Sequence, residues 1–260
     1  MRSQLGLVTA AAICACLIAP SLLPAGHAVA AGPARPLVLE LYTSEGCSSC
    51  PPAEALVGKL MTDPDLLPLA FHVDYWDSQG WRDRFSLSAA TQRQHDWARH
   101  FGGANIYTPQ MIIDGRRSVL GSDGPAIVAA LRDSLVARQA SEPMGIEATV
   151  ADGQLRIELS GNCNPGSCDT YLVSYLPQAS THVGRGENAG QTLVEWNIVR
   201  SVQKLGTTKG ETTAPPAASP AASWQIAVST LPADATKLAI VVQDSHSGGV
   251  RGARVVDLHS

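Results

Sequence analysis

Cys47-Ser48-Ser49-Cys50-Pro51-Pro52 joins an apolar run, residues 37–42, to a segment with helical periodicity, residues 53–61. A strand, a tight turn that holds two cysteines and then a helix form the layout typical of a thiol-disulfide site. Prolines suit the first turn of a helix, where a missing backbone N–H costs nothing. The turn therefore places Cys47 at a helix N-terminus, where unpaired N–H groups and the helix dipole favour a thiolate.

The spacing of the two cysteines indicates their chemistry. With two residues between them, Cys47 and Cys50 can form and open a disulfide reversibly. We expect Cys47 to be the exposed attacking thiolate and Cys50 the buried resolving thiol. An inert structural disulfide is one alternative, and a copper or zinc site that uses both thiolates is another. Zinc normally takes four ligands, and no second cysteine pair lies nearby in the sequence, so redox chemistry is favoured.

Composition and the N-terminal residues indicate an exported globular protein. The 260 residues are 45% hydrophobic and 16% charged with a net charge of -4, and no Lys/Arg cluster indicates nucleic-acid binding. Residues 1–30 combine a positive start, an apolar stretch and Ala28-Val29-Ala30, as in a secretory signal peptide cleaved before Ala31. We expect a periplasmic or secreted protein with no membrane span after signal removal. An uncleaved membrane anchor is the alternative.

Periodicity and turn residues predict the order β-α-β-α-β-β-α for residues 31–142. The expected elements are residues 37–42, 53–61, 66–73, 87–101, 110–113, 116–120 and 125–136. Asp114-Gly115 predicts a hairpin between the last two strands, and Gly102-Gly103 ends the second helix. This is the minimal order of an α/β thioredoxin-like domain.

Residues 143–260 have a different pattern, and Glu142-Pro143 marks the expected boundary. Alternating strand patterns occur at residues 146–150, 155–159, 170–176, 192–202, 224–228, 238–243 and 251–258. They predict a small antiparallel β-sandwich-like all-β C-terminal domain. Residues 206–223, rich in Thr, Ala and Pro, are expected to form a loop within it.

Two further features support a redox site. Thr108-Pro109 precedes the third strand, where a proline faces the cysteines in this topology, and we expect a cis peptide bond there rather than a trans edge proline. Thr108 and Pro109 would then orient an incoming chain. Glu40 lies within the first apolar run, so burial is expected to raise its pKa and to let it accept a proton from Cys50. The alternative is a strand-end glutamate that reaches solvent.

Polar and aromatic residues follow the second strand. Asp74, Tyr75, Trp76 and Trp81 lie at the carboxyl end of the sheet and are candidates for the wall of a substrate groove. Simple packing is the alternative for the aromatic residues. His72 alternates onto a strand face and is interpreted as a satisfied core histidine rather than a ligand.

Two loops beyond the first domain also carry motifs. Cys163 and Cys168 flank a short turn and are predicted to form a structural disulfide that pins a hairpin. Gly184-Arg185-Gly186-Glu187-Asn188-Ala189-Gly190 is Gly-rich but lacks the strand-loop-helix setting of a phosphate-binding loop.

Several stretches together resemble a known family. They are residues 42–52, 71–77, 107–111, 184–190 and 197–200. These stretches resemble a secreted bacterial family within the thioredoxin-like superfamily, domain of unknown function 1223. The resemblance implies the fold and export, and from the wider superfamily it implies that Cys47 and Cys50 are the redox pair and Pro109 the cis-proline. Ser48-Ser49 matches neither the Gly-Pro of reductants nor the Pro-His of strong oxidants, so the direction of electron flow stays open.

The sequence thus favours an exported thiol-disulfide oxidoreductase that acts on protein or small-molecule disulfides through Cys47 and Cys50. Its expected partners are thiols or disulfides and a redox recycling protein, with no cofactor. The alternative is not an enzyme but a binding module that binds and delivers copper or zinc through the same two thiolates. A third hypothesis is that the C-terminal domain recruits a partner and the cysteine pair only regulates it.

Overall fold

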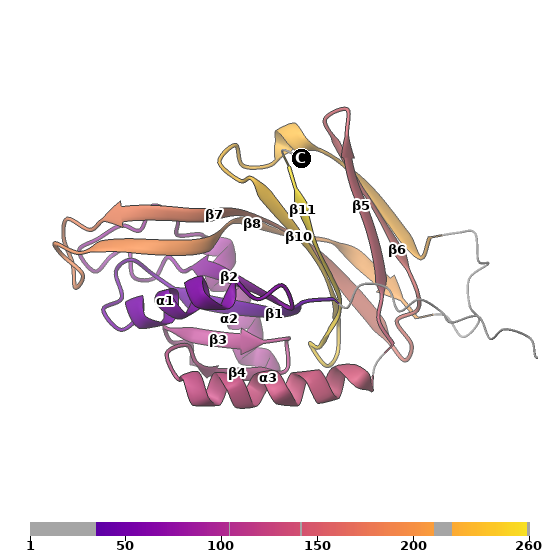
Figure 1. Cartoon of the computed structure of the whole chain (residues 1–260), viewed down its shortest axis with the longest axis horizontal. Helices are drawn as coiled ribbons and strands as arrows, with labels where there is room; N and C mark the ends of the chain where they lie inside the picture. The colour runs from indigo at the N-terminus through magenta and orange to yellow at the C-terminus, as the bar shows by residue number, and fades with distance from the viewer. Residues whose placement is uncertain (1–34, 104, 141, 211–219, 259–260) are drawn as a thin grey trace, which may run out of the picture. The chain divides into compact units, whose positions relative to one another are not determined.

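The computed structural model describes residues 35–103, 105–140, 142–210 and 220–258 (Figure 1). The signal peptide predicted at residues 1–30 lies outside these ranges. Over the residues described, no helix has the length and apolar character needed to cross a membrane.

The first half of the chain has the predicted order β-α-β-α-β-β-α. Its elements are β1 (Leu37–Thr43), α1 (Pro51–Leu60), β2 (Leu66–His72), α2 (Ser88–His100), β3 (Gln110–Ile113), β4 (Arg117–Leu120) and α3 (Gly124–Gln139). Asp114 and Gly115 adopt positive φ angles of 49° and 67° between β3 and β4, as a tight hairpin turn requires. Asp123 caps α3 by accepting a hydrogen bond from the Ala126 N–H at 3.0 Å.

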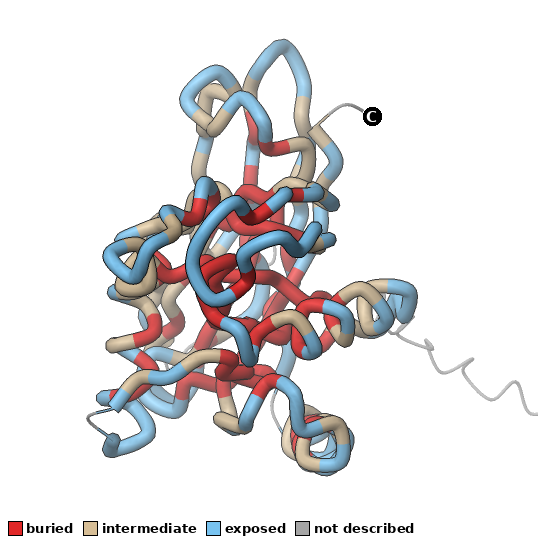
Figure 2. The backbone as a smooth tube through the Cα atoms, turned by 90° about the vertical axis from the view of Figure 1, so that its left-hand side faces the viewer, coloured by how far each residue is buried: buried red, intermediate tan, exposed pale blue. Residues whose placement is uncertain are grey.

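Strand β1 is buried on both faces, which explains its nearly continuous apolar sequence. Leu37, Leu39 and Leu41 pack toward α1 and α3, whereas Val38 and Tyr42 pack toward α2 and the neighbouring strands. Figure 2 shows the buried positions concentrated in the interior of the molecule and the exposed positions toward its periphery. The turn that carries the cysteines begins where this buried strand ends.

The C-terminal strands are divided between two sheets. They are β5 (Gly145–Ala151), β6 (Gln154–Ser160), β7 (Ser167–His182), β8 (Thr192–Lys209), β9 (Ala222–Ala227), β10 (Lys237–Asp244) and β11 (Val250–Asp257). One sheet has eight strands in the order β11-β10-β7-β8-β2-β1-β3-β4, and the other has three in the order β5-β6-β9. The fold is therefore a mixed α/β sheet with a cysteine pair at a helix start, plus a small antiparallel three-stranded sheet.

The predicted separate β-sandwich is only partly correct. Strands β7, β8, β10 and β11 continue the N-terminal sheet, because β8 pairs in parallel with β2 through Ala70 and Ile198. The three-stranded sheet packs against this extension through apolar side chains that include Leu155, Ile157 and Ile240. The boundary at residues 142–143 stays a prediction.

Two local expectations need correction. Cys163 and Cys168 form a disulfide, but it links the loop after β6 to the start of β7, and β6 and β7 belong to different sheets, so it does not pin a hairpin. The loop expected at residues 206–223 is shorter than predicted, because β8 extends to Lys209 and β9 begins at Ala222. Residues 211–219 of that loop lie outside the described part of the chain.

Candidate functional site

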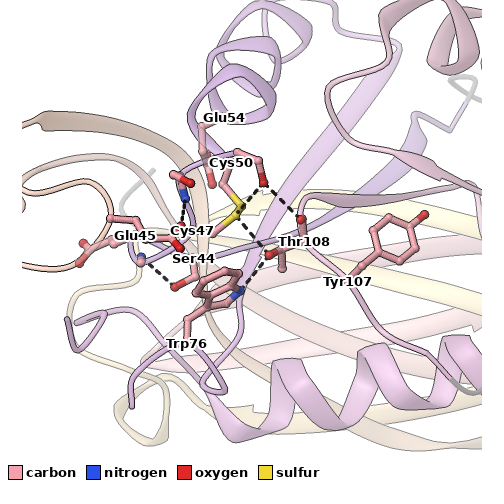
Figure 3. The surroundings of a disulfide bond; sticks show 12 residues. Ser44, Glu45, Cys47, Cys50, Glu54, Trp76, Tyr107 and Thr108 are labelled. Carbon is pink, nitrogen blue, oxygen red and sulfur yellow. Dashed lines mark hydrogen bonds between the residues drawn. A yellow bond between two sulfur atoms is a disulfide. The ribbon is translucent and has the colours of Figure 1, made fainter. Parts of the chain in front are cut away.

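Cys47 and Cys50 form a disulfide at the N-terminal end of α1, with their Cα atoms 5.4 Å apart (Figure 3). The turn closes through a hydrogen bond from the Cys50 N–H to the Cys47 carbonyl at 3.1 Å. Pro51 and Pro52 occupy the first turn of the helix, as predicted. Because neither proline has an N–H, the helix leaves fewer unpaired donors inside the turn.

Cys47 is fully buried, so the expectation of an exposed sulfur is wrong. The Thr108 hydroxyl donates a hydrogen bond to Cys47 Sγ at 3.2 Å, and Trp76 Nε1 donates to that hydroxyl oxygen at 2.9 Å (Figure 3). The hydroxyl oxygen of the exposed Ser49 lies 3.3 Å from the same sulfur. These side chains cover Cys47 from the β3 side and from the turn itself.

The Thr108–Pro109 peptide bond is cis, as predicted. The Thr108 carbonyl oxygen accepts a hydrogen bond from the Ser49 hydroxyl at 3.5 Å. The loop before β3 therefore contacts the cysteine turn through both the hydroxyl and the carbonyl of one residue. This juxtaposition is the one expected of a redox turn and a facing proline.

The Gly-rich loop between β7 and β8, residues 183–191, also belongs to the site, which the sequence did not indicate. The buried Asn188 amide donates hydrogen bonds to the carbonyl oxygens of Glu45 and Cys47, at 2.9 and 3.0 Å. Glu187 accepts a hydrogen bond from the Ser48 N–H at 3.0 Å, and the Ser48 side chain together with this N–H holds the pKa of the Glu187 carboxyl below its ordinary value. A segment some 140 residues distant in sequence thus fixes the backbone of the cysteine turn.

A group of buried ionisable side chains adjoins Cys50. This acidic cluster comprises Glu45, Glu54, His72, Asp83 and Glu195, all of them buried. His72 Nδ1 lies 2.7 Å from an Asp83 carboxylate oxygen and 3.9 Å from a Glu195 oxygen, and its Nε2 lies 3.9 Å from a Glu54 oxygen. His72 is therefore a core histidine as predicted, but one surrounded by carboxyl groups.

Half of the carboxyl oxygens in the acidic cluster lack hydrogen-bond partners among the described residues. Both carboxyl oxygens of Glu54, one each of Glu45 and Glu195, and His72 Nε2 have no hydrogen-bond partner among the described residues. Asp83 differs, because it accepts hydrogen bonds from the N–H groups of Glu45 and Phe85 as well as contacting His72. Unpartnered buried polar atoms are costly, so their concentration at one place indicates a functional site.

Burial and like charges shift the pKa values in this cluster. Burial raises the pKa of Glu54, and burial together with Asp83 raises the pKa of Glu45. Burial raises the pKa of Glu195 to about 8. Burial alone would lower the pKa of His72, but the Asp83 carboxylate and the other carboxyl groups raise it to about 10. One imidazolium thus faces more carboxyl groups than it can neutralise.

A cavity of about 240 Å³ lies between the start of α1 and the first residues of β8. Glu45, Glu54, Glu195 and Cys50 line its polar side. Its apolar wall is formed by residues of α1 and β8, including Pro51, Leu193 and Trp196. The cavity therefore brings carboxyl groups of the acidic cluster and Cys50 to one place.

Glu40 has a different environment from the one predicted. Burial favours a raised pKa, but the Arg93 guanidinium, which binds it through two hydrogen bonds at 2.6 and 2.7 Å, holds the pKa below its ordinary value. Tyr42 and Trp97 donate to the same carboxylate at 2.7 and 3.0 Å. The expected raised pKa is therefore wrong, and the side chain is directed toward α2 rather than α1.

The four residues proposed for a substrate groove have separate roles. Trp76 reaches Thr108, and Trp81 Nε1 donates to Glu45 at 2.6 Å. Asp74 accepts a hydrogen bond from the Thr91 hydroxyl at 2.6 Å, and Tyr75 packs against the core beside Trp76. Among the described residues, those that line the cavity beside Cys50 include none of these four.

The structure adds no further ligands to the two thiolates that the copper or zinc hypothesis requires, among the residues it describes. Over the described ranges, no group of three or more His, Cys, Asp or Glu side chains is arranged to hold a metal ion. The acidic cluster adjoins the cysteines, but its side chains are not arranged as such a group either.

The position of Glu54 beside Cys50 could have been predicted from the sequence, whereas the positions of Glu195 and Asn188 in the site could not. Glu54 follows Cys50 by four residues on a helix, so both lie on one face. Glu195 and Asn188 reach the site only because β8 pairs with β2, a contact that no local pattern encodes.

Comparisons with known proteins agree with this architecture. Protein AGR_C_4864 from Agrobacterium tumefaciens has a crystal structure that matches at a TM-score of 0.70 and 28% identity, covering 87% of this chain and 96% of that one. HBP35 of Porphyromonas gingivalis matches at a TM-score of 0.58 and 12% identity, covering 86% and 75%, a likeness of fold alone. No curated protein matches the chain. The family described as proteins of unknown function, DUF1223, matches residues 38–243, so the chain belongs to the DUF1223 family.

Proposed function

We propose that this protein is a thiol-disulfide oxidoreductase whose redox centre is Cys47–Cys50 in a thioredoxin-like domain, residues 31–142. The observation that carries the proposal is the disulfide at the start of α1, facing the cis Thr108–Pro109 bond. Residues 143–260 complete the site through β8 and the loop at residues 183–191. The proposed setting is the periplasm or the exterior, where such disulfides persist.

Hydrogen bonds around Cys47 support its role as the attacking sulfur. When the pair is reduced, the Thr108 hydroxyl can donate to the Cys47 thiolate, and Trp76 aligns that hydroxyl. Donors that bind the charged form favour the thiolate. Because Ser49 is the exposed group in contact with the sulfur, an incoming partner displaces its hydroxyl to reach Cys47.

Glu54 takes the role of proton acceptor that the sequence gave to Glu40. Glu54 lines the same cavity as Cys50, and both of its carboxyl oxygens are without hydrogen-bond partners among the described residues. Glu40, in contrast, is occupied by Arg93, Tyr42 and Trp97. A carboxylate with a raised pKa is the better matched base for a thiol.

The exchange proceeds in two balanced steps. The Cys47 thiolate attacks a substrate disulfide, a mixed disulfide forms, and one substrate sulfur leaves as a thiolate. Glu54 then takes the Cys50 proton, and Cys50 attacks the Cys47 sulfur, which restores the disulfide and releases the second substrate thiolate. The substrate gains two electrons and the protein loses them, whereas the reverse sequence oxidises a dithiol. A recycling thiol or disulfide protein completes the cycle.

Trapping of mixed disulfides tests this function. In cells that express Cys50→Ser, partners should remain attached to Cys47 and be released by dithiothreitol. The control Cys50→Ser/Cys47→Ser should trap nothing, and Cys163→Ser should trap nothing either, because its pair is structural. If the double variant retained as many partners as the single variant, or if Cys47→Ser reduced insulin at the wild-type rate, the proposal would be wrong.

A further inference from the structure

The cavity beside Cys50 has a chemical character that thiol exchange alone does not require. Proton transfer from Cys50 needs one carboxylate, yet Glu45, Glu54 and Glu195 all present unpartnered oxygens at this place. Each of these residues is more than nine-tenths buried, with exposed fractions of 1%, 6% and 1%. The surplus of buried acceptors points to a missing donor.

The cluster contains too little positive charge to supply that donor. His72 is its one buried cation, and its Nδ1 is occupied by Asp83. Arg84 approaches Glu45 only to 3.9 Å, and its side chain is 53% exposed to solvent. The charged groups that line the cavity, from the β1–α1 turn, α1 and β8, are therefore carboxyl groups, and the nearby His72 from β2 and Asp83 from the β2–α2 loop add one buried cation and one further carboxylate.

The size and lining of the cavity define what fits. About 240 Å³ is smaller than the pockets that hold whole drug-sized ligands, and it suits the end of one long side chain. Pro51, Leu193 and Trp196 offer apolar contact for an alkyl stem, and an indole attracts a cation. An organic cation satisfies the open oxygens without the ligand geometry of a metal, which the described residues do not provide.

We propose that this cavity binds the cationic end of a substrate side chain, the ammonium of lysine or the guanidinium of arginine, and so selects disulfides with a basic residue nearby. Because Cys50 lines the cavity, a side chain held there lies beside the redox pair. The selection of substrates rests on the proposed function, whereas binding of the cation does not depend on turnover.

Binding of the cation should release protons. The free protein holds a proton on Glu195 below about pH 8, and a bound cation favours the ionised carboxylate. Affinity therefore rises with pH up to about 8 and then levels off for a guanidinium, which stays charged.

Calorimetric titration of the oxidised full chain tests the proposal with three probes: n-butylguanidinium, n-butylammonium and neutral n-butanol. At pH 8.5 we expect saturable binding of one or both cations with a dissociation constant of about 1 mM, typical of so small a ligand, and none of n-butanol. Tighter binding of the guanidinium indicates arginine, and tighter binding of the ammonium indicates lysine. Equal binding of the butanol, or no saturation by either cation, would overturn the proposal.

Variants locate the binding site. Glu195→Gln should weaken cation binding about tenfold, whereas Glu158→Gln, an exposed carboxylate on β6, should leave it unchanged. If Glu195→Gln does not fold, Ala55→Lys supplies a tethered ammonium from the exposed rim of the cavity and should abolish binding of the free probe. Unchanged affinity in the folded variant would place the cation elsewhere and overturn the proposal.

The test separates this inference from the proposed function. Cys47→Ser should still bind the cations, because the sulfur of Cys47 is not in the cavity lining. In the wild type, a disulfide peptide with Arg or Lys beside its cysteine should be reduced about tenfold faster than the Ser-containing peptide, and Glu195→Gln should equalise the two rates. Slow but equal reduction in the wild type would retain the redox function and refute the selectivity.

Discussion

Two buried groups of charges lie on opposite faces of the N-terminal sheet, and they are built in opposite ways. Around Glu40, one carboxylate meets the Arg93 guanidinium and the donors of Tyr42 and Trp97, so its oxygens are bound and its pKa is lowered. In the acidic cluster, several carboxyl groups share His72, and the pKa values of Glu54 and Glu195 are raised. Burial is similar in both places.

The difference teaches that burial of a carboxylate does not reveal its role, whereas its partners do. A compensated pair resists both protonation and ligand binding, because every oxygen is already occupied. An uncompensated group exchanges protons near neutral pH and retains capacity for a donor. We therefore assign the compensated pair to the stability of the fold and propose the acidic cluster beside Cys50 for chemistry.

The largest effect is expected from a substitution that breaks the compensated pair of Glu40 and Arg93. Arg93→Met leaves the buried Glu40 carboxylate without its cation, and should lower the free energy of unfolding by about 3–5 kcal/mol. Urea denaturation at pH 7 measures this loss. The double variant Arg93→Met/Glu40→Gln is the matched control and should recover a large part of it, because no unpaired charge is then buried. A loss below about 1 kcal/mol in the single variant would contradict the comparison.

Next in size is the loss of the proton acceptor. Glu54→Gln should slow the attack of Cys50 on a mixed disulfide about 100-fold at pH 7, because no carboxylate then takes the thiol proton. Stopped-flow measurement of disulfide closure follows this step. Wild-type closure should accelerate as pH rises through the raised pKa of Glu54, and the variant should lack that dependence. Glu40→Gln is the control from the other cluster, and its closure rate should keep the wild-type pH profile.

A smaller effect on stability is expected when the 183–191 loop no longer holds the cysteine turn beside the acidic cluster. Asn188→Ala removes the donors to the Glu45 and Cys47 carbonyls, and should cost about 2 kcal/mol of stability because both oxygens are left buried. Gln191→Ala is the control, since the exposed Gln191 belongs to the same loop and its side chain donates to Asn188 Oδ1, at 3.3 Å, rather than to a carbonyl of the cysteine turn. Equal midpoints of urea denaturation for the two variants would show that the loop does not support the turn.

The smallest effect, counted per pH unit, concerns the pH dependence of stability. Between pH 4.5 and about 8, folded Glu195 retains a proton that the unfolded chain has lost, so its contribution to stability falls as pH rises. One such group changes the free energy of unfolding by at most about 1.4 kcal/mol per pH unit. Glu195→Gln should therefore become more stable relative to the wild type as pH rises through this window. Parallel stability curves would show that Glu195 titrates normally.

The first half of the fold could be predicted because its signals are local. The apolar run before the cysteines, the prolines of α1 and the Asp114-Gly115 turn each act over a few residues. The assignment of β7, β8, β10 and β11 to the same sheet could not be predicted, because alternation shows that a segment is a strand but not which strand it pairs with.

For the site, the sequence alone determined the cysteine pair, its position at a helix start and the cis bond at Thr108–Pro109, since these depend on residues adjacent in the chain. Only the tertiary structure decided the charge environment. Glu40 became a structural carboxylate when α2 brought Arg93 to it, and Cys50 gained an acidic cavity when β8 brought Glu195 beside His72. The electrostatic energy of a buried charge depends on neighbours in space, and those neighbours come from distant parts of the chain.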